Sequence, residues 1–116
     1  MIGDKILVIA VTGCVSGVAH TYMAAEAIRE ICRKQGWRVQ VETQGALGIE
    51  NPLTPEVIET ADVVVLAADV DLADLDRFAG RRIIRTDVRT PLRMPDRIAR
   101  AVARVAHLQN GYVMDL

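Results

Sequence analysis

The stretch that decides the fold is residues 5–36, which read KILVIAVTGCVSGVAHTYMAAEAIREICRKQG. Residues 5–11 are apolar after the lysine, which is typical of a central parallel strand covered on both faces. After a short loop, apolar residues recur at helical spacing from about residue 17 to 35, and Gly36 ends the predicted helix. The inner stripe of this helix comprises Ala24, Ala25, Ile28, Ile31 and Cys32. A strand followed by such a helix indicates the first βα unit of an α/β domain.

Three more βα units follow along the chain. Strands are predicted at residues 38–43, 62–67 and 82–85, a short helix opening at Thr54-Pro55-Glu56, a weaker helical stretch at 72–78 and a last helix at 93–107. Because parallel strands are joined by right-handed crossovers, we expect an α/β fold with an open four-stranded parallel sheet in the order 2-1-3-4. Helices should cover both faces of this single Rossmann-like domain, which is expected to span residues 1–108, with 109–116 a loose C-terminal tail.

Length and composition exclude several classes of protein. The chain has 116 residues, 51% hydrophobic and 25% charged, which fits one globular domain. Its apolar runs are far shorter than the roughly 20 residues that span a bilayer, and the N-terminus lacks a signal-peptide pattern. We therefore expect a soluble cytoplasmic domain. A formal net charge of -1 gives no overall electrostatic case for nucleic-acid binding.

The charges are unevenly distributed along the chain. Residues 77–104 contain nine arginines against only Asp87 and Asp96, whereas residues 42–76 contain nine acids and no base. One region of the surface is therefore expected to be basic and another acidic.

The loop between the first strand and the first helix carries the candidate chemistry. Cys14 stands where free backbone N–H groups and the positive end of the helix dipole converge. This position favours an anion, either the thiolate itself or an oxyanion held against the sulfur. Gly13 and Gly17 let the backbone pack closely around such a ligand, and the Ser16 hydroxyl adds a donor.

The second cysteine, Cys32, lies on the inner helix stripe and is predicted to be a core residue. The two cysteines form no C-x-x-C or Cys/His pattern, so neither a disulfide nor a metal site is predicted. The glycine spacing of the loop differs from the dinucleotide and Walker fingerprints, which indicates neither NAD nor ATP.

The same loop belongs to a longer motif, Cys14-Val15-Ser16-Gly17-Val18-Ala19-His20-Thr21 followed by Met23-Ala24-Ala25-Glu26-Ala27. This motif closely resembles the Cys-Pro-Thr-Gly-x-Ala-His-Thr-x-Met-Ala-Ala-Glu segment of fructose-type enzyme IIB domains of the bacterial phosphoenolpyruvate:sugar phosphotransferase system. The resemblance continues through residues 41–45, 48–51, 61–69 and 77–80, and so covers roughly residues 5 to 105. Val15 stands where the family usually has proline and Ser16 where it usually has threonine, and the serine keeps the hydroxyl.

The resemblance implies a function and a mechanism. An enzyme IIA partner would carry a phosphohistidine, Cys14 would take its phosphoryl group, and the phosphocysteine would donate it to a fructose-like sugar held by the membrane-embedded enzyme IIC. The chain would work in the cytoplasm at the inner face of the membrane, without cofactor, metal or nucleic acid. The implied phosphate-binding residues are Gly13, Val15, Ser16, Gly17, Val18, Ala19, His20 and Thr21.

Four further features each allow two interpretations. His20 either points at the phosphoryl group or caps and packs the helix. Residues 44–51, with Gln44 and Gly45, form either a second wall of the site and a docking loop or only a turn. Asp69 is either a crevice residue or a loop cap. Arg93, Arg97, Arg100 and Arg104 are spaced i, i+4, i+7, i+11 and form either a solvated face or a docking surface for an acidic partner.

Two other functions compete with the phosphocarrier. A cysteine-based phosphatase or arsenate reductase also places a nucleophilic cysteine in a first-loop anion cradle, but a phosphatase would require Cys-x5-Arg where this chain has Cys14-x5-His20. A small ligand-binding or regulatory module would leave Cys14 with a structural role only.

Overall fold

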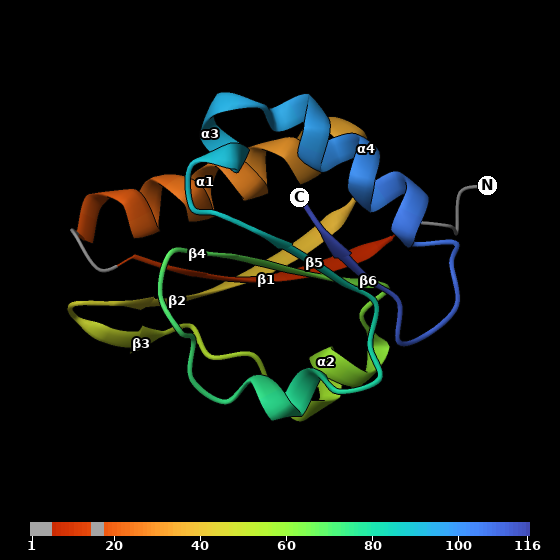
Figure 1. The fold of residues 1–116 in the computed structure, drawn as a ribbon, viewed down its shortest axis with the longest axis horizontal. Helices are drawn as coiled ribbons and strands as arrows, with labels where there is room; N and C mark the ends of the chain where they lie inside the picture. The colour runs from red at the N-terminus through yellow and green to blue at the C-terminus, as the bar shows by residue number, and fades with distance from the viewer. Residues whose placement is uncertain (1–5, 15–17) are drawn as a thin grey trace.

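The part of the chain that the computed structural model describes, residues 6–14 and 18–116, folds around a six-stranded mixed sheet (Figure 1). The strands lie in the order β3-β2-β1-β4-β5-β6. Their bounds are β1 Leu7–Gly13, β2 Arg38–Gly45, β3 Gly48–Glu50, β4 Val63–Ala68, β5 Ile83–Thr86 and β6 Val113–Asp115. Strand β3 runs antiparallel to β2, and the other neighbouring strands pair in parallel.

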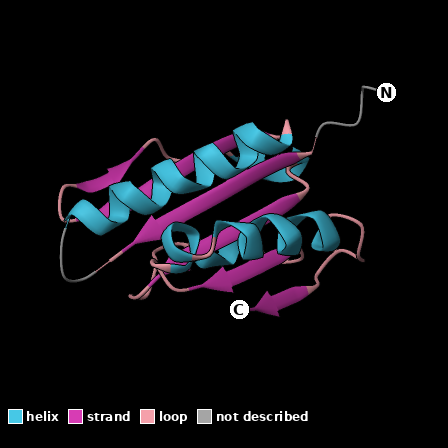
Figure 2. Cartoon of the chain, turned by 90° about the horizontal axis from the view of Figure 1, so that it is seen from above, coloured by secondary structure: helices cyan, strands magenta, loops and turns pink. Residues whose placement is uncertain are grey.

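Helices cover both faces of the sheet, as Figures 1 and 2 show. The helical elements are α1 Val18–Gln35, α2 Pro55–Thr60, the short 3-10 helix η1 Leu75–Phe78, α3 Thr90–Arg93 and α4 Pro95–Val105. One hydrophobic cluster lies between the sheet and the layer of α1 and α4, and a second lies between the sheet and the layer of α2 and η1. Strands β1 and β4 are buried along nearly their whole length because both of their faces are covered.

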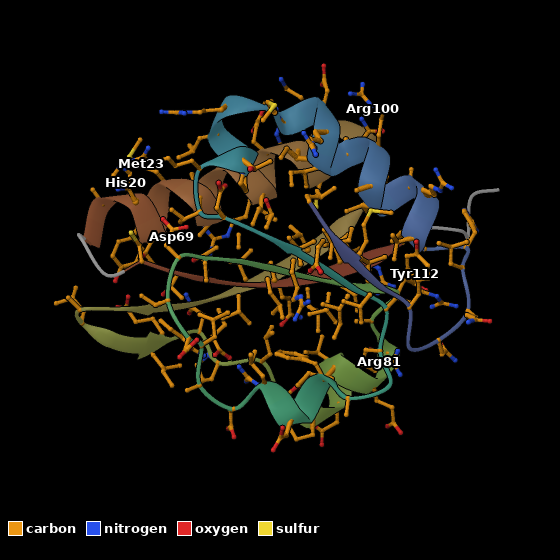
Figure 3. The ribbon with its side chains drawn as sticks, in the orientation of Figure 1. His20, Met23, Asp69, Arg81, Arg100 and Tyr112 are labelled. Carbon is orange, nitrogen blue, oxygen red and sulfur yellow. The ribbon has the colours of Figure 1, made fainter. Side chains whose placement is uncertain are left out.

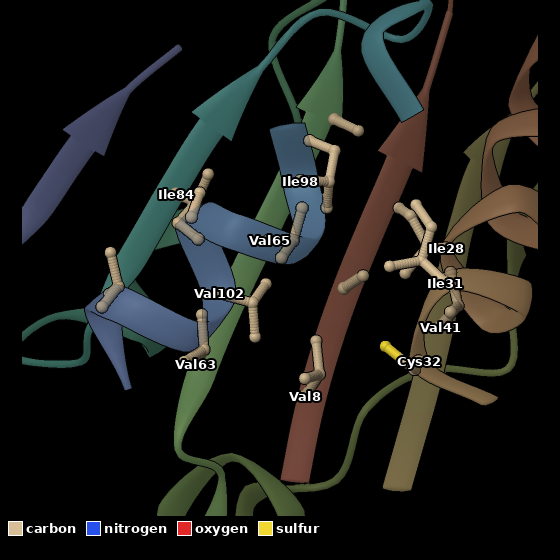
Figure 4. Packing of buried hydrophobic residues seen from close by; sticks show 14 of the residues in the cluster. Val8, Ile28, Ile31, Cys32, Val41, Val63, Val65, Ile84, Ile98 and Val102 are labelled. Atoms are coloured by element: carbon tan, nitrogen blue, oxygen red, sulfur yellow. The ribbon is translucent and has the colours of Figure 1, made fainter. Parts of the chain in front are cut away.

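Two helix features predicted from local sequence are confirmed, the buried stripe of α1 and the cap of α2. The α1 stripe of Ala24, Ala25, Ile28, Ile31 and Cys32 is buried as predicted, and Figure 4 shows Ile28, Ile31 and Cys32 beside Val8 and Val41 of the sheet. Helix α2 begins with the predicted cap, in which Thr54 Oγ1 accepts a hydrogen bond from the Val57 N–H at 3.2 Å.

The predicted four-stranded parallel sheet in the order 2-1-3-4 is wrong. The sheet has two further strands, of which β3 makes it mixed, although the α/β class holds. Strand β3 lies inside residues 44–51, for which the sequence predicts a wall or a turn. It begins at Gly48, which has a φ of 93° and directly follows the turn at residues 46–47. Each missed strand has only three residues, too few for an alternating pattern to be visible in the sequence.

Strand β6 lies in residues 109–116, which were expected to be a loose tail. It extends the sheet because the Ile83 N–H donates to the Tyr112 carbonyl and the Leu116 N–H donates to the Arg85 carbonyl, both at 2.9 Å. Arg85 also pairs with Asp115, at 2.6 Å between Nε and Oδ1.

The strand order reverses at β1. From β1 the chain passes first to β2 on one side and later to β4 on the other side. In open α/β sheets this switch point, at the carboxyl ends of the strands, is where ligands bind. The residues that follow β1 and β4 are therefore the first candidates for a functional site.

Candidate functional site

Cys14 directly follows the last residue of β1, the central strand at the switch point. It is half-buried, and helix α1 begins four residues later at Val18. Three predicted phosphate-binding residues, Val15, Ser16 and Gly17, lie outside the described residues, and so does the side chain of Val18. Ala19, His20 and Thr21 lie in the first turn of α1. The thiol thus stands at the carboxyl edge of the sheet, just before a helix N-terminus.

Gly13 is held in a gap that accepts no side chain. A Cβ atom there would lie 2.8 Å from Leu72 Cδ2 and 3.0 Å from the carbonyl oxygen of Gln44. The Asp69 N–H donates to the Gly13 carbonyl at 3.2 Å, which draws the start of the β4–η1 loop against the end of β1. A side chain at this position would therefore have to displace the end of the Leu72 side chain and crowd the Gln44 backbone carbonyl, which favours glycine.

A buried threonine hydroxyl lies under the first turn of α1. Thr12 Oγ1 donates to the Thr21 carbonyl at 3.0 Å and so ties the helix to the end of β1. Thr21 Oγ1 is fully buried and has no hydrogen-bond partner among residues 6–14 and 18–116. Buried polar atoms of this kind are rare in folded proteins, and a hydroxyl beside a helix start can serve as a donor to an anion.

A buried carboxylate that sequence reasoning missed lies two residues before the predicted second wall at residues 44–51. Glu42 on β2 is 0% exposed and accepts four hydrogen bonds, from Arg77 Nη1 at 2.9 Å, Arg77 Nη2 at 2.7 Å, the Leu53 N–H at 2.9 Å and Gln44 Nε2 at 2.8 Å. Burial by itself raises the pKa of Glu42, but the hydrogen bonds from Arg77, Gln44 and Leu53 outweigh it and hold the pKa below its ordinary value. The carboxylate is therefore ionised and fully partnered.

Gln44 connects this buried pair to the loop after β4. Its Oε1 accepts from the Ala73 N–H at 2.7 Å, and its Nε2 donates to the Ala73 carbonyl at 3.3 Å. Gln44 also pairs with Gly13 in the sheet register. The Gln44 side chain therefore holds the Ala73 backbone in place beside the site. Both ends of its amide are already hydrogen-bonded, to Ala73 and to Glu42. A signal for the Glu42 and Arg77 pair existed, since both residues fall in segments that carry the family resemblance.

Three other predicted site residues, His20, Asp69 and Gly45, lie on α1, after β4 and at the end of β2. His20 is half-buried, and Figure 3 shows it with Met23 on the upper side of the first turns of α1, with Asp69 below the helix. Asp69 Oδ1 accepts from the Val88 N–H at 3.1 Å, so Asp69 caps the loop after β5. Gly45 lies against Thr21, and an added Cβ there would make only ordinary contacts of 3.5 Å or more.

Two hollows in the described part of the chain lie away from Cys14, which lines neither of them. A hollow of about 140 Å³ at the carboxyl ends of β4 and β5 is lined by Ala68, Val70 and Leu72 among others, whereas a larger one of about 670 Å³ lies on the α2 side, lined by Leu53, Arg77 and their neighbours.

Within the described ranges, no helix has the length and apolar character to cross a bilayer.

Comparisons with known proteins agree with this geometry. The family model described as "PTS system, Lactose/Cellobiose specific IIB subunit" matches residues 9–99. The PTS system fructose-like EIIB component 2 of Escherichia coli (strain K12) is 46% identical over 101 residues, which cover 87% of this chain and 93% of that protein. The PTS system fructose-specific EIIB'BC component of the same strain is 53% identical over 79 residues, which are 68% of this chain and 14% of that protein.

A solved structure shows the same architecture. The crystal structure of a predicted fructose-specific IIB from Escherichia coli superposes with a TM-score of 0.91 at 44% sequence identity, covering 97% of this chain and 99% of that chain.

Proposed function

The chain belongs to the enzyme IIB family of the phosphoenolpyruvate:sugar phosphotransferase system, and we propose that it is a phosphocarrier in which Cys14 holds the phosphoryl group. The observation that carries this proposal is the place of Cys14, a half-buried thiol directly after the central strand, at the switch point and just before α1. The thiolate is the reactive form of cysteine. The positive end of a helix dipole stabilises such a negative charge.

The proposed reaction has two transfers. In the first, the thiol loses its proton and Cys14 Sγ attacks the phosphorus of a phosphohistidine on an enzyme IIA partner, so that the S–P bond forms as the N–P bond breaks. In the second, a sugar hydroxyl oxygen attacks the same phosphorus, the hydroxyl loses its proton, and the S–P bond breaks to regenerate the thiolate. Both transfers need positioning and charge stabilisation rather than further covalent chemistry.

The surrounding residues have separate proposed roles. The backbone N–H groups at the start of α1 hold the phosphoryl oxygens, and the buried Thr21 hydroxyl adds a donor. The roles of Val15, Ser16, Gly17 and Val18 in this cradle rest on the family resemblance. Gly13 lets the β2 and β4 loops approach, and Gln44 holds the β4–η1 loop as the second wall.

The names of the relatives support the proposed partners and sugar. The names of two relatives contain fructose, and we propose that a fructose-like sugar receives the phosphoryl group through a membrane-embedded enzyme IIC. The chain would then work on the cytoplasmic side, at the inner face of the membrane.

Reconstitution tests the proposed function. Membrane vesicles that carry enzyme IIC and expose its cytoplasmic side, supplied with phosphoenolpyruvate, the upstream carriers and fructose, should form sugar phosphate only when this chain is added. Cys14→Ser should abolish the product, and Cys32→Ser, which alters only a core thiol, should retain it. Product formation by Cys14→Ser would reject the proposal.

The phosphatase alternative makes a different demand. Cysteine phosphatases clamp two phosphoryl oxygens with an arginine, whereas His20 at the matching position offers a single donor from a given ring edge. We therefore expect negligible turnover of p-nitrophenyl phosphate, and Cys14-dependent turnover at phosphatase rates would favour the alternative.

A further inference from the structure

Four arginines form a surface that the phosphocarrier role does not use. We call Arg93, Arg97, Arg100 and Arg104 the α4 basic face; the first ends α3 and the others lie on α4. All four are exposed. Among the described residues, the arginines in ion pairs are Arg29, Arg33, Arg77 and Arg85, so none of the α4 basic face is in an ion pair. Asp96, in the first turn of α4, is the one carboxylate within residues 93–104, which leaves the face a net positive charge.

The helix geometry turns these charges outward together. Arg97, Arg100 and Arg104 are spaced i, i+3, i+7 and so share one side of α4. The residues of α4 that are buried against the sheet are Ile98, Ala101, Val102 and Val105. Figure 3 shows Arg100 pointing away from the sheet, and Figure 2 views the molecule from this side.

The opposite layer of the molecule is acidic. Exposed carboxylates there lie on α2 and around η1, and they comprise Glu56, Glu59, Asp74 and Asp76. Since α2 and α4 cover opposite faces of the sheet, the charges are separated across the molecule (Figure 1). With a net charge of only -1, this separation orients the chain in an electric field, with the α4 basic face toward a negative surface.

The composition of the face favours lipid phosphate over other anions. Guanidinium groups pair with phosphate through two parallel hydrogen bonds. Specific protein interfaces usually contain an apolar core, but Met94 is the single large apolar residue within residues 93–104 that is exposed. Single-stranded nucleic acid is usually bound on exposed aromatic rings, and the four aromatic residues of the chain, Tyr22, Trp37, Phe78 and Tyr112, all lie outside the face and are at most half-exposed.

We propose that the α4 basic face binds the phosphate groups of anionic phospholipids, so that the chain lies on the membrane surface. Helix α3 starts just after the carboxyl end of β5, and α4 then leads away from that edge. Cys14 lies at the carboxyl edge from which α4 leads away, so a lipid contact on the α4 basic face leaves the thiol open to its partners. This contact is independent of phosphoryl transfer and goes beyond the proposed function.

Sedimentation with lipid vesicles tests the proposal. The full chain is mixed with vesicles of phosphatidylcholine alone, or of phosphatidylcholine with one third phosphatidylglycerol. We expect binding to the anionic vesicles only, weakening as salt shortens the Debye length. Each basic residue near such a surface changes the partition coefficient about fivefold, so Arg97→Gln with Arg100→Gln should weaken binding about 25-fold.

A matched control changes the net charge equally. Arg29→Gln with Arg33→Gln also removes two positive charges, but these arginines are paired with Glu26 and Glu30 on α1, so vesicle binding should stay at the wild-type level. Equal weakening in both double variants, or no preference for anionic vesicles, would overturn the proposal. So would an α4 variant that binds vesicles normally but accepts phosphoryl groups slowly from enzyme IIA, since the face would then dock an acidic protein.

A second control separates this inference from the phosphocarrier role. Cys14→Ser leaves the α4 basic face intact and should bind anionic vesicles like the wild type. Failure of phosphoryl transfer therefore leaves the vesicle result unaffected, and failure of vesicle binding leaves the transfer result unaffected.

Discussion

At the scale of single residues, the two cysteines lie in opposite environments. Cys32 is 1% exposed among the core side chains under α1, and burial raises the pKa of its thiol from 9.0 to about 12. Cys14 is half-buried at the edge of the sheet. The same residue type is therefore buried and protonated at one position and solvent-accessible at the other.

Thiol labelling should reveal this difference. In the folded protein at pH 8, iodoacetamide is expected to label Cys14 while leaving Cys32 unmodified, because the Cys32 thiol is both inaccessible and protonated at that pH. Peptide mapping by mass spectrometry locates the label. Both thiols should react in urea, which serves as the control, and comparable labelling of Cys32 in the folded protein would contradict the assignment.

Sequence and structure differ in which residues of the site they reveal. Cys14 and Gly13 could be predicted because a strand, a glycine and a helix start are adjacent in sequence. Local pattern could not predict that Glu42 pairs with Arg77, although both lie in segments that carry the family resemblance. The partners are 35 residues apart, and a buried charge on a strand is recognisable only once its partner is placed. His20 stays a prediction.

At the scale of elements, Gly13 is where three strands constrain one residue. Gly13→Ala would place a methyl group against the Gln44 carbonyl, a backbone atom that cannot move without shifting β2. We expect a loss of about 1 to 3 kcal/mol in the free energy of unfolding, as in other overpacked sites. Gly45→Ala is the matched control, because its Cβ would make ordinary contacts with Thr21. Urea denaturation measures the free energy of unfolding of both variants. An equal loss in the two variants would show that the close contact at Gly13 is unimportant.

The elements also show the limit of sequence patterns. Strands β1 and β4 are continuous apolar runs, and the α1 stripe repeats with helical period, so both kinds of element could be predicted. Strands β3 and β6 form because a turn or a neighbouring edge presents unpaired backbone groups, and three residues are enough to pair with them. Such pairing depends on the tertiary structure, so the local pattern of apolar residues cannot predict it.

At the scale of the whole molecule, the buried Glu42 makes stability depend on pH. Its pKa in the folded protein lies below the ordinary value of 4.5, so its contribution is present above pH 4.5 and is lost as the pH falls through the folded pKa. Glu42→Gln should cost about 1.5 to 3 kcal/mol at pH 7, the range for hydrogen bonds to a charged group. The difference from the wild type should narrow as the pH falls below 4.5.

Urea denaturation across this pH range measures the effect. Asp115→Asn is the matched control, because Asp115 pairs with Arg85 at an exposed site where the side chains are 66% and 58% exposed. We expect that variant to follow the wild-type curve at every pH. A Glu42→Gln difference that stays constant below pH 4.5 would contradict the role of the buried carboxylate.

The most direct test of the central claim, that Cys14 carries the phosphoryl group, is the intact mass of the protein after incubation with phosphoenolpyruvate and the upstream carriers. We predict the gain of one phosphoryl group by the wild type and by Cys32→Ser, and no gain by Cys14→Ser. A phosphoryl group on Cys14→Ser, or its absence from a folded Cys32→Ser, would contradict the claim.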